Sequence, residues 1–200
     1  MNLKKAYFIV FLVLLVDQIS KIYVKTHFLL GERGQVEVTK WFKILFIENE
    51  GMAWGVELPG IYGKLILTTF RIIAVGCIGY WMHQSYKNKA SNILLVAIAL
   101  ILAGAFGNII DSVFYGKIFN DSSYEVATLF SDKPYGTWFH GKVVDMFYFP
   151  IIQDVQFPSW IPIWGGNHFT FFNAIFNIAD VAISTGVGIL IVFNKKAFAK

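Results

Sequence analysis

The sequence has little charge and almost no cysteine, and each shortage narrows the class of protein. Only 15% of its 200 residues are charged, whereas about a quarter are charged in an ordinary soluble domain. Because 56% of the residues are hydrophobic, the composition predicts an integral membrane protein. The single cysteine, Cys77, cannot form an intramolecular disulfide and lies in an apolar run, so we expect it to be a small packing residue.

The sequence also lacks the patterns of a metal site and of a nucleic-acid surface. The four histidines are scattered without metal-ligand spacing. The basic residues flank apolar runs instead of forming a separate stripe, although the formal net charge is +4. We therefore expect no metal, no cofactor and no nucleic-acid partner.

Four apolar runs predict four transmembrane helices, since a helix needs roughly 20 apolar residues to span a bilayer. The first run is not a cleaved signal peptide, because Asp17 interrupts it and no small-residue cleavage site follows. Apolar–polar alternation in residues 35–48 predicts a hairpin or small sheet. We predict an all-α membrane protein with a small extracytoplasmic β-sheet and a long outer loop before helix 4, in one domain of residues 1–200. The predicted helices cover residues 6–24, 61–82, 92–111 and 172–193, and the outer segments are residues 25–60 and 112–171.

Lysine placement predicts the topology of these helices. Lysines cluster at alternate helix ends, which the positive-inside rule assigns to the cytoplasm. Both termini are then cytoplasmic, and the aspartates of the helices converge on the outer leaflet. The lysines concerned are Lys4, Lys5, Lys87, Lys89, Lys195, Lys196 and Lys200.

The outer stretch of residues 146–166 is aromatic and contains three of the five prolines. Proline disfavours a spanning helix, and tryptophan favours the membrane interface. We expect this stretch to rest in the outer interface and to form part of a cover over the site.

Two carboxylates stand out, Asp180 inside the last apolar run and Asp145 at the edge of another. A carboxylate in a membrane helix is costly and usually functional. Asp145 and Asp180 therefore predict a site where one aspartate activates water and the other holds a proton. The spacing of Asp17 and Lys21 favours an ion pair on one helix face, with a structural role.

Other polar residues in the helices leave alternatives open. Asn108 and Asp111 share a helix face and either scaffold a site or end a helix facing water. Arg71 must reach water, a partner or the interface, and the sequence does not identify its partner. A proton-coupled transporter that uses Asp17, Asp111 and Asp180 as relay groups is an alternative function. A structural membrane subunit is another.

Taken in order, five short motifs resemble the lipoprotein signal peptidase family, signal peptidase II. They are Asp17-x-x-x-Lys21, Asn49-x-Gly51-x-Ala53-Trp54, Gly104-x-x-Gly107-Asn108-x-x-Asp111, Val143-Val144-Asp145-Met146-Phe147 and Phe176-Asn177-x-Ala179-Asp180.

The resemblance implies an aspartyl endopeptidase of the bacterial inner membrane. Such an enzyme cuts the signal peptide from diacylglyceryl-modified prolipoproteins just before the lipidated cysteine, with its active site at the outer face. It would work as a monomer among membrane lipids and bind the cyclic-peptide inhibitors of the family. The implied catalytic pair is Asp145 and Asp180, and the residues that bind substrate or shape the site are Asn49, Gly51, Asn108, Asp111, Asn177 and Ala179.

The sequence departs from the family in two ways. Ser112 stands where the family usually has arginine, so we expect Lys117 or Lys142 to take over what that arginine stabilises. The intervals from Asp111 to Asp145 and from Asp145 to Asp180 are also longer than is usual in the family, which lengthens the outer loops.

Overall fold

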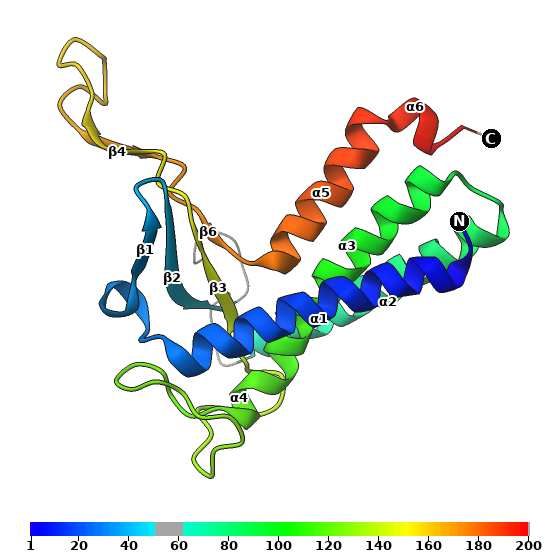
Figure 1. Cartoon of the computed structure of the whole chain (residues 1–200), viewed down its shortest axis with the longest axis horizontal. Coiled ribbons are helices and arrows are strands. Elements are labelled where there is room, and N and C mark those ends of the chain that lie inside the picture. The colour runs from blue at the N-terminus through cyan, green and yellow to red at the C-terminus, as the bar shows by residue number, and fades with distance from the viewer. Residues whose placement is uncertain (51–61, 200) are drawn as a thin grey trace.

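The computed structural model describes residues 1–50 and 62–199, and it combines long helices with a small sheet at one end (Figure 1). Three helices are long and apolar enough to cross a membrane, and all three predicted runs extend further than expected. Two are α1 (Leu3–His27) and α2 (Gly63–Lys87). The third joins α3 (Asn92–Ile110), the π-helical turn η3 (Asp111–Tyr115) and α4 (Gly116–Ile118).

The fourth apolar helix is shorter than the sequence predicts. It does not begin at residue 172, because α5 covers Ile178–Val192 and is followed by the short α6 (Asn194–Ala197). Asn177 ends the preceding extended chain and caps α5. Its side chain accepts from the backbone amide of Asp180, and the Asp180 carboxylate accepts from the backbone amide of Asn177. At 1.5 Å per residue α5 spans about 22 Å, less than the ~30 Å apolar core of a bilayer.

The predicted hairpin is present and forms half of a four-stranded antiparallel sheet. Strand β1 (Val36–Thr39), preceded by the short helix η1 (Gly31–Gly34), pairs with β2 (Phe42–Asn49). Two strands that the sequence did not predict complete the order β1-β2-β3-β6, namely β3 (Val143–Tyr148) and β6 (Ile175–Phe176). The all-α expectation therefore needs correction. Asp145, expected in a loop, lies within β3 opposite Ile47.

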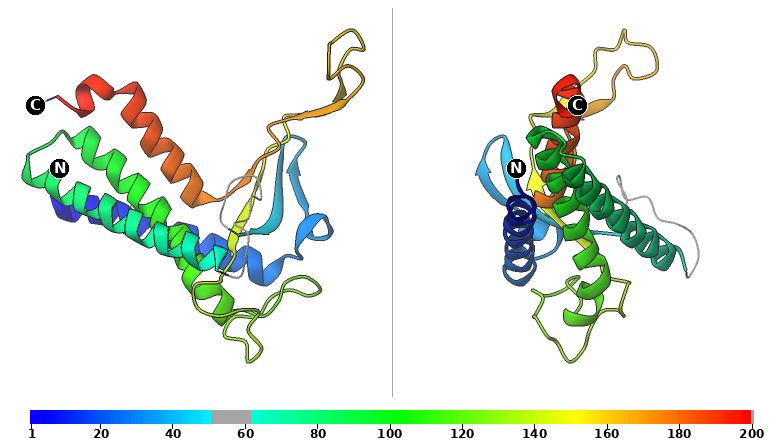
Figure 2. Two further views of the ribbon diagram at one scale, coloured as in Figure 1. Left: turned by 180° about the vertical axis from the view of Figure 1, so that it is seen from behind. Right: turned by 90° about the vertical axis from the view of Figure 1, so that its right-hand side faces the viewer.

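Beyond the sheet, β4 (Ile152–Gln156) and β5 (His168–Phe171) form a second hairpin. This hairpin projects from the sheet and away from the helices (Figures 1 and 2). Its tip is apolar yet exposed, with Trp160 79% and Ile163 91% accessible. The described part of this stretch contains no helix, as expected, and the cover over the site stays a prediction.

Helix α3 is the centre of the bundle and packs against α1, α2 and α5. Small residues, Gly104 and Gly107 among them, permit this close approach. A Cβ atom on Gly104 would lie 2.1 Å from the Ala179 carbonyl oxygen of α5. One on Gly107 would lie 2.6 Å from a carboxylate oxygen of Asp17 in α1. These glycines therefore place two aspartate-bearing helices directly against α3. Cys77, by contrast, is exposed on α2 and does not pack inside the protein.

A buried lysine near the C-terminal end of α1 ties the loop after α4 to the sheet. Lys25 is fully buried, pairs with Glu48 of β2 and donates to Ser122 at 2.8 Å. Its ammonium group also lies 5.1 Å from the ring centroids of Phe119 and Tyr135. Charge pairing and cation–π contacts together offset part of the desolvation cost of this lysine.

Candidate active site

Asn177 joins the two aspartates that the sequence singles out. Its amide nitrogen donates to Asp145 at 2.7 Å, to the Val144 carbonyl at 3.2 Å and to Asn108 at 3.2 Å. Its side-chain oxygen accepts from the Asp180 backbone amide at 3.0 Å. Since Asn177 is fully buried, strand β3 and the first turn of α5 are held together at this one side chain.

Asp145 occupies a nearly closed environment. Only 5% of the residue is exposed, and its second oxygen accepts from Asn49 at the end of β2. Burial and the charge of Asp180 raise the pKa of Asp145 to about 7, and the hydrogen bonds from Asn177 and Asn49 oppose that rise. A carboxyl with this pKa can hold a proton at neutral pH.

Asp180 is held from the other side by α3. The amide of Asn108 donates to an oxygen of Asp180 at 2.9 Å, and the second oxygen accepts from the backbone of Asn177. Asn108 therefore lies against Asp180 and Asn177 and does not end a helix in water.

A buried charge cluster centred on Lys21 lies next to the aspartate pair. The lysine contacts Asp17 at 3.0 Å, Asp111 at 2.8 Å and the side-chain oxygen of Asn108 at 2.8 Å. Asp17 also accepts from the backbone amide of Ala179 at 2.9 Å, so it satisfies a free amide in the first turn of α5. Asp111 accepts from the Val144 amide at 3.3 Å. The cluster thus connects α1, α3, α5 and β3.

The structure places nearly all predicted site residues in this one network. Asp111, left open by the sequence, is fully buried and paired with Lys21. In the part of the chain that the structure describes, neither Lys117 nor Lys142 pairs with Asp111, and Ser112 donates to the Asn108 carbonyl at 3.0 Å. Gly51 lies outside the described residues.

Sequence reasoning missed Gln18 and Tyr115. Gln18 donates to Asp17 at 3.1 Å and to Asp111 at 3.0 Å, and it accepts from the hydroxyl of Tyr115 at 3.2 Å. The only sequence signal was the position of Gln18 beside Asp17, because Gln18 and Asp111 are 93 residues apart.

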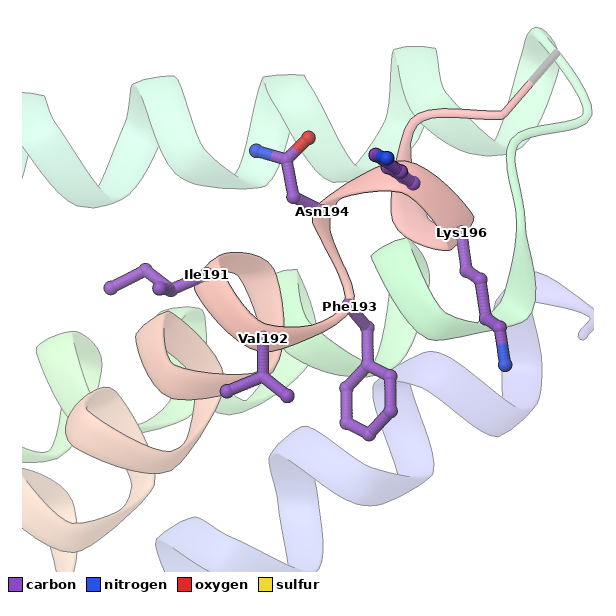
Figure 3. A pocket seen from close by; sticks show the side chains of 6 residues that line it. Ile191, Val192, Phe193, Asn194 and Lys196 are labelled. Atoms are coloured by element: carbon purple, nitrogen blue, oxygen red, sulfur yellow. The ribbon is translucent and has the colours of Figure 1, made fainter.

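A surface hollow of about 480 Å³ lies at the junction of α5 and α6 and is lined by residues 191–196 (Figure 3). These residues follow one another in sequence, at the opposite end of α5 from Asp180. The hollow therefore contributes nothing to the aspartate site.

Comparison with known proteins decides the family. The profile of the family described as signal peptidase (SPase) II matches residues 9–195. The chain belongs to the signal peptidase II family. It is thus a protease, and the transporter and structural-subunit alternatives are set aside.

Relatives and solved structures agree with this assignment. A lipoprotein signal peptidase of Porphyromonas gingivalis is 49% identical over 186 residues, covering 92% of this chain and 80% of the relative. One of Amoebophilus asiaticus is 38% identical over 195 residues, covering 96% and 78%. A solved bacterial membrane enzyme superposes with a TM-score of 0.63 at 25% identity, covering 99% of this chain and 93% of that one. The family and the three long apolar helices together identify the chain as a bacterial membrane protein.

The raised pKa of Asp145 leads to a prediction for stability. An aspartate in an unfolded chain has a pKa of about 3.9. The folded protein therefore binds the proton of Asp145 more tightly than the unfolded chain does. The stabilisation from this proton is fully present below about pH 4 and is lost as pH rises toward 7. Asp145→Asn removes the carboxyl, so its unfolding free energy at pH 8 should exceed that of wild type by on the order of 3 kcal/mol. Unfolding in detergent at pH 5 and pH 8 tests this, and a difference that does not change with pH would contradict it.

Proposed function

We propose that this protease is an aspartyl endopeptidase that removes the signal peptide of diacylglyceryl prolipoproteins just before the lipidated cysteine. The observation that carries the proposal is that one buried side chain, Asn177, donates to the Asp145 carboxylate and accepts from the Asp180 backbone amide, so that the two aspartates lie side by side. The charge of Asp180 acts on the Asp145 carboxyl, and two neighbouring carboxylates do not both ionise easily, which favours one shared proton and hydrolysis by an aspartate pair.

We assign the shared proton to Asp145, because burial and the neighbouring charge raise its pKa to about 7. Asp180 then acts as the base that takes a proton from water as the water attacks the substrate carbonyl. Asp145 donates its proton to the carbonyl oxygen. When the tetrahedral intermediate collapses, Asp180 gives the proton it took from water to the leaving amine and Asp145 takes its own proton back from the hydroxyl. The acyl chains of the substrate lie in lipid, with the scissile bond at the outer edge of the membrane.

The direct test is cleavage of a synthetic diacylglyceryl peptide by the purified protein in detergent. A peptide of the same sequence with an unmodified cysteine is the matched control. Cleavage of the lipidated peptide alone, at the bond before the cysteine, supports the proposal. Cleavage of both peptides at equal rates, or at another bond, would reject it.

Asn177 has two separable roles that a pair of variants can resolve. Asn177→Ala should lower the unfolding free energy by about 1 kcal/mol through loss of the helix cap. Cleavage should also fall roughly tenfold or more, because Asp145 loses a hydrogen bond to its charged form. Asn177→Ser keeps a capping oxygen and should restore stability but not cleavage. If the serine variant cleaves at the wild-type rate, Asn177 acts only as a cap.

The topology that we propose has four passes, with both termini cytoplasmic and the aspartates at the outer face of the inner membrane. The N-terminus, the α2–α3 connection and α6 lie at one end of the molecule, and Ser91 donates to the Ala197 carbonyl at 2.8 Å (Figure 1). The basic residues beside these segments favour the cytoplasm.

An impermeant thiol reagent on intact cells tests this topology. With Cys77→Ala as background, Asp132→Cys should be labelled and Asn88→Cys should not, and both positions are exposed. Labelling of Asn88→Cys alone would reverse the orientation.

A further inference from the structure

Arg71 lies on the inward face of α2. Lys64, Thr68 and Arg71 follow helical spacing and share one face of this helix. Thr68 is buried and donates to the Phe139 carbonyl at 3.1 Å, so this face is turned toward the protein. Phe70 and Ile73, on the other side, are more than half exposed and suit contact with lipid. Arg71 therefore does not point into the bilayer.

One guanidinium nitrogen of Arg71, Nη1, is buried without a hydrogen-bond partner. Among the residues that the structure describes, no other buried side-chain nitrogen or oxygen lacks one. A buried charged donor without an acceptor is costly, and such a position in a membrane helix is usually functional. The network around Lys21 is fully satisfied, so Arg71 stands apart from the structural charge pairs of this protein.

Arg71 is nevertheless close to the catalytic site. Its charge interacts with those of Asp180 and Asp111, but no hydrogen bond joins it to either carboxylate. Helices α2 and α5 both pack against α3, which brings Arg71 and Asp180 to neighbouring helices around it (Figure 2). Nη1 of Arg71 therefore remains available to donate to a bound peptide.

We propose that Arg71 is a substrate-positioning residue that donates to a backbone carbonyl of the signal peptide beside the scissile bond. This inference rests on the proposed function. A peptide entering from lipid carries carbonyls that need donors, and the guanidinium offers donors only. Arg71 therefore supplies the donor that the peptide carbonyl needs, and the carbonyl supplies the acceptor that Nη1 needs. This hydrogen bond fixes the peptide opposite Asp145 and Asp180.

The test measures binding separately from cleavage. A fluorescent diacylglyceryl peptide is titrated against Arg71→Met, Arg71→Lys and Ile73→Met, all carrying Asp145→Asn so that bound peptide is not consumed. A maltoside detergent free of phospholipid ensures that the signal reports on the peptide and not on a lipid headgroup. The Ile73→Met control changes the lipid-facing side of the same helix.

We expect Arg71→Met to weaken binding roughly 10- to 100-fold, the loss typical of a hydrogen bond to a charged group. Arg71→Lys should recover part of the affinity, and Ile73→Met should bind as the parent does. Because Arg71 has no partner in the described structure, the melting temperature of Arg71→Met should stay the same or rise. Unchanged binding, or a lower melting temperature with normal binding, would overturn the inference. Cleavage by the wild type tests the proposed function separately, since the binding assay uses inactive protein.

Discussion

Asp145→Asn and Asp180→Asn should each reduce cleavage of a diacylglyceryl peptide by at least roughly 10³-fold, within the range of general acid–base catalysis. Asparagine matches the size of aspartate but can neither accept a proton from water nor donate one at neutral pH. Both carboxylates accept a hydrogen bond from Asn177, so both substitutions act on the pair of aspartates that we propose to be catalytic. Single-turnover rates with purified protein would measure the effect.

A third aspartate provides the matched control. Asp154 lies on the β4–β5 hairpin, where its exposed side chain contacts His168 at 2.5 Å. Asp154→Asn should therefore cleave at the wild-type rate. Each variant should elute as folded protein from size-exclusion chromatography. Near-normal turnover by either Asp145→Asn or Asp180→Asn would remove that residue from the catalytic pair.

Lys21→Met should destabilise the protein by roughly 3–5 kcal/mol, the usual cost of removing one partner from a buried ion pair. The substitution leaves Asp17 and Asp111 buried side by side without a cation. It also removes the donor to Asn108, which holds Asp180. Unfolding by SDS titration in mixed micelles would measure the loss.

Two comparisons isolate the charge effect at Lys21. Lys43 pairs loosely with Glu37 at 3.9 Å on the sheet, so Lys43→Met should cost less than about 1 kcal/mol. Adding Asp17→Asn and Asp111→Asn to Lys21→Met should restore part of the stability, because the uncompensated charges are then gone. Equal losses for Lys21→Met and Lys43→Met would show that the buried cluster contributes little.

Local features of the sequence were sufficient to predict three of the long helices and the first hairpin. An apolar run of roughly 20 residues predicts a spanning helix. Alternation of apolar and polar residues in residues 35–48 predicts strands. The Asp17–Lys21 contact also follows from spacing along one helix. In each case the deciding interaction lies within a few residues, so periodicity alone reveals it.

The start of the fourth helix shows why apolar content is insufficient. Four of residues 172–177 are apolar, and both a spanning helix and a strand favour such residues. The choice depends on β6 pairing with β3 and on Asn177 capping α5. The first of these contacts is tertiary, and no local pattern encodes it.

The assembly of the site was likewise decided by tertiary structure. The sequence by itself determined only that Asp145 and Asp180 are carboxylates in or beside apolar runs, from which we predict a site at a membrane border. It did not determine that Asp145 lies in a strand, because its partner strand β2 is about 100 residues away. Nor did it show that Lys21 also pairs with Asp111, since that contact requires α1 and α3 to pack at Gly107. Desolvation makes these distant polar contacts obligatory, and only the folded chain determines which groups meet.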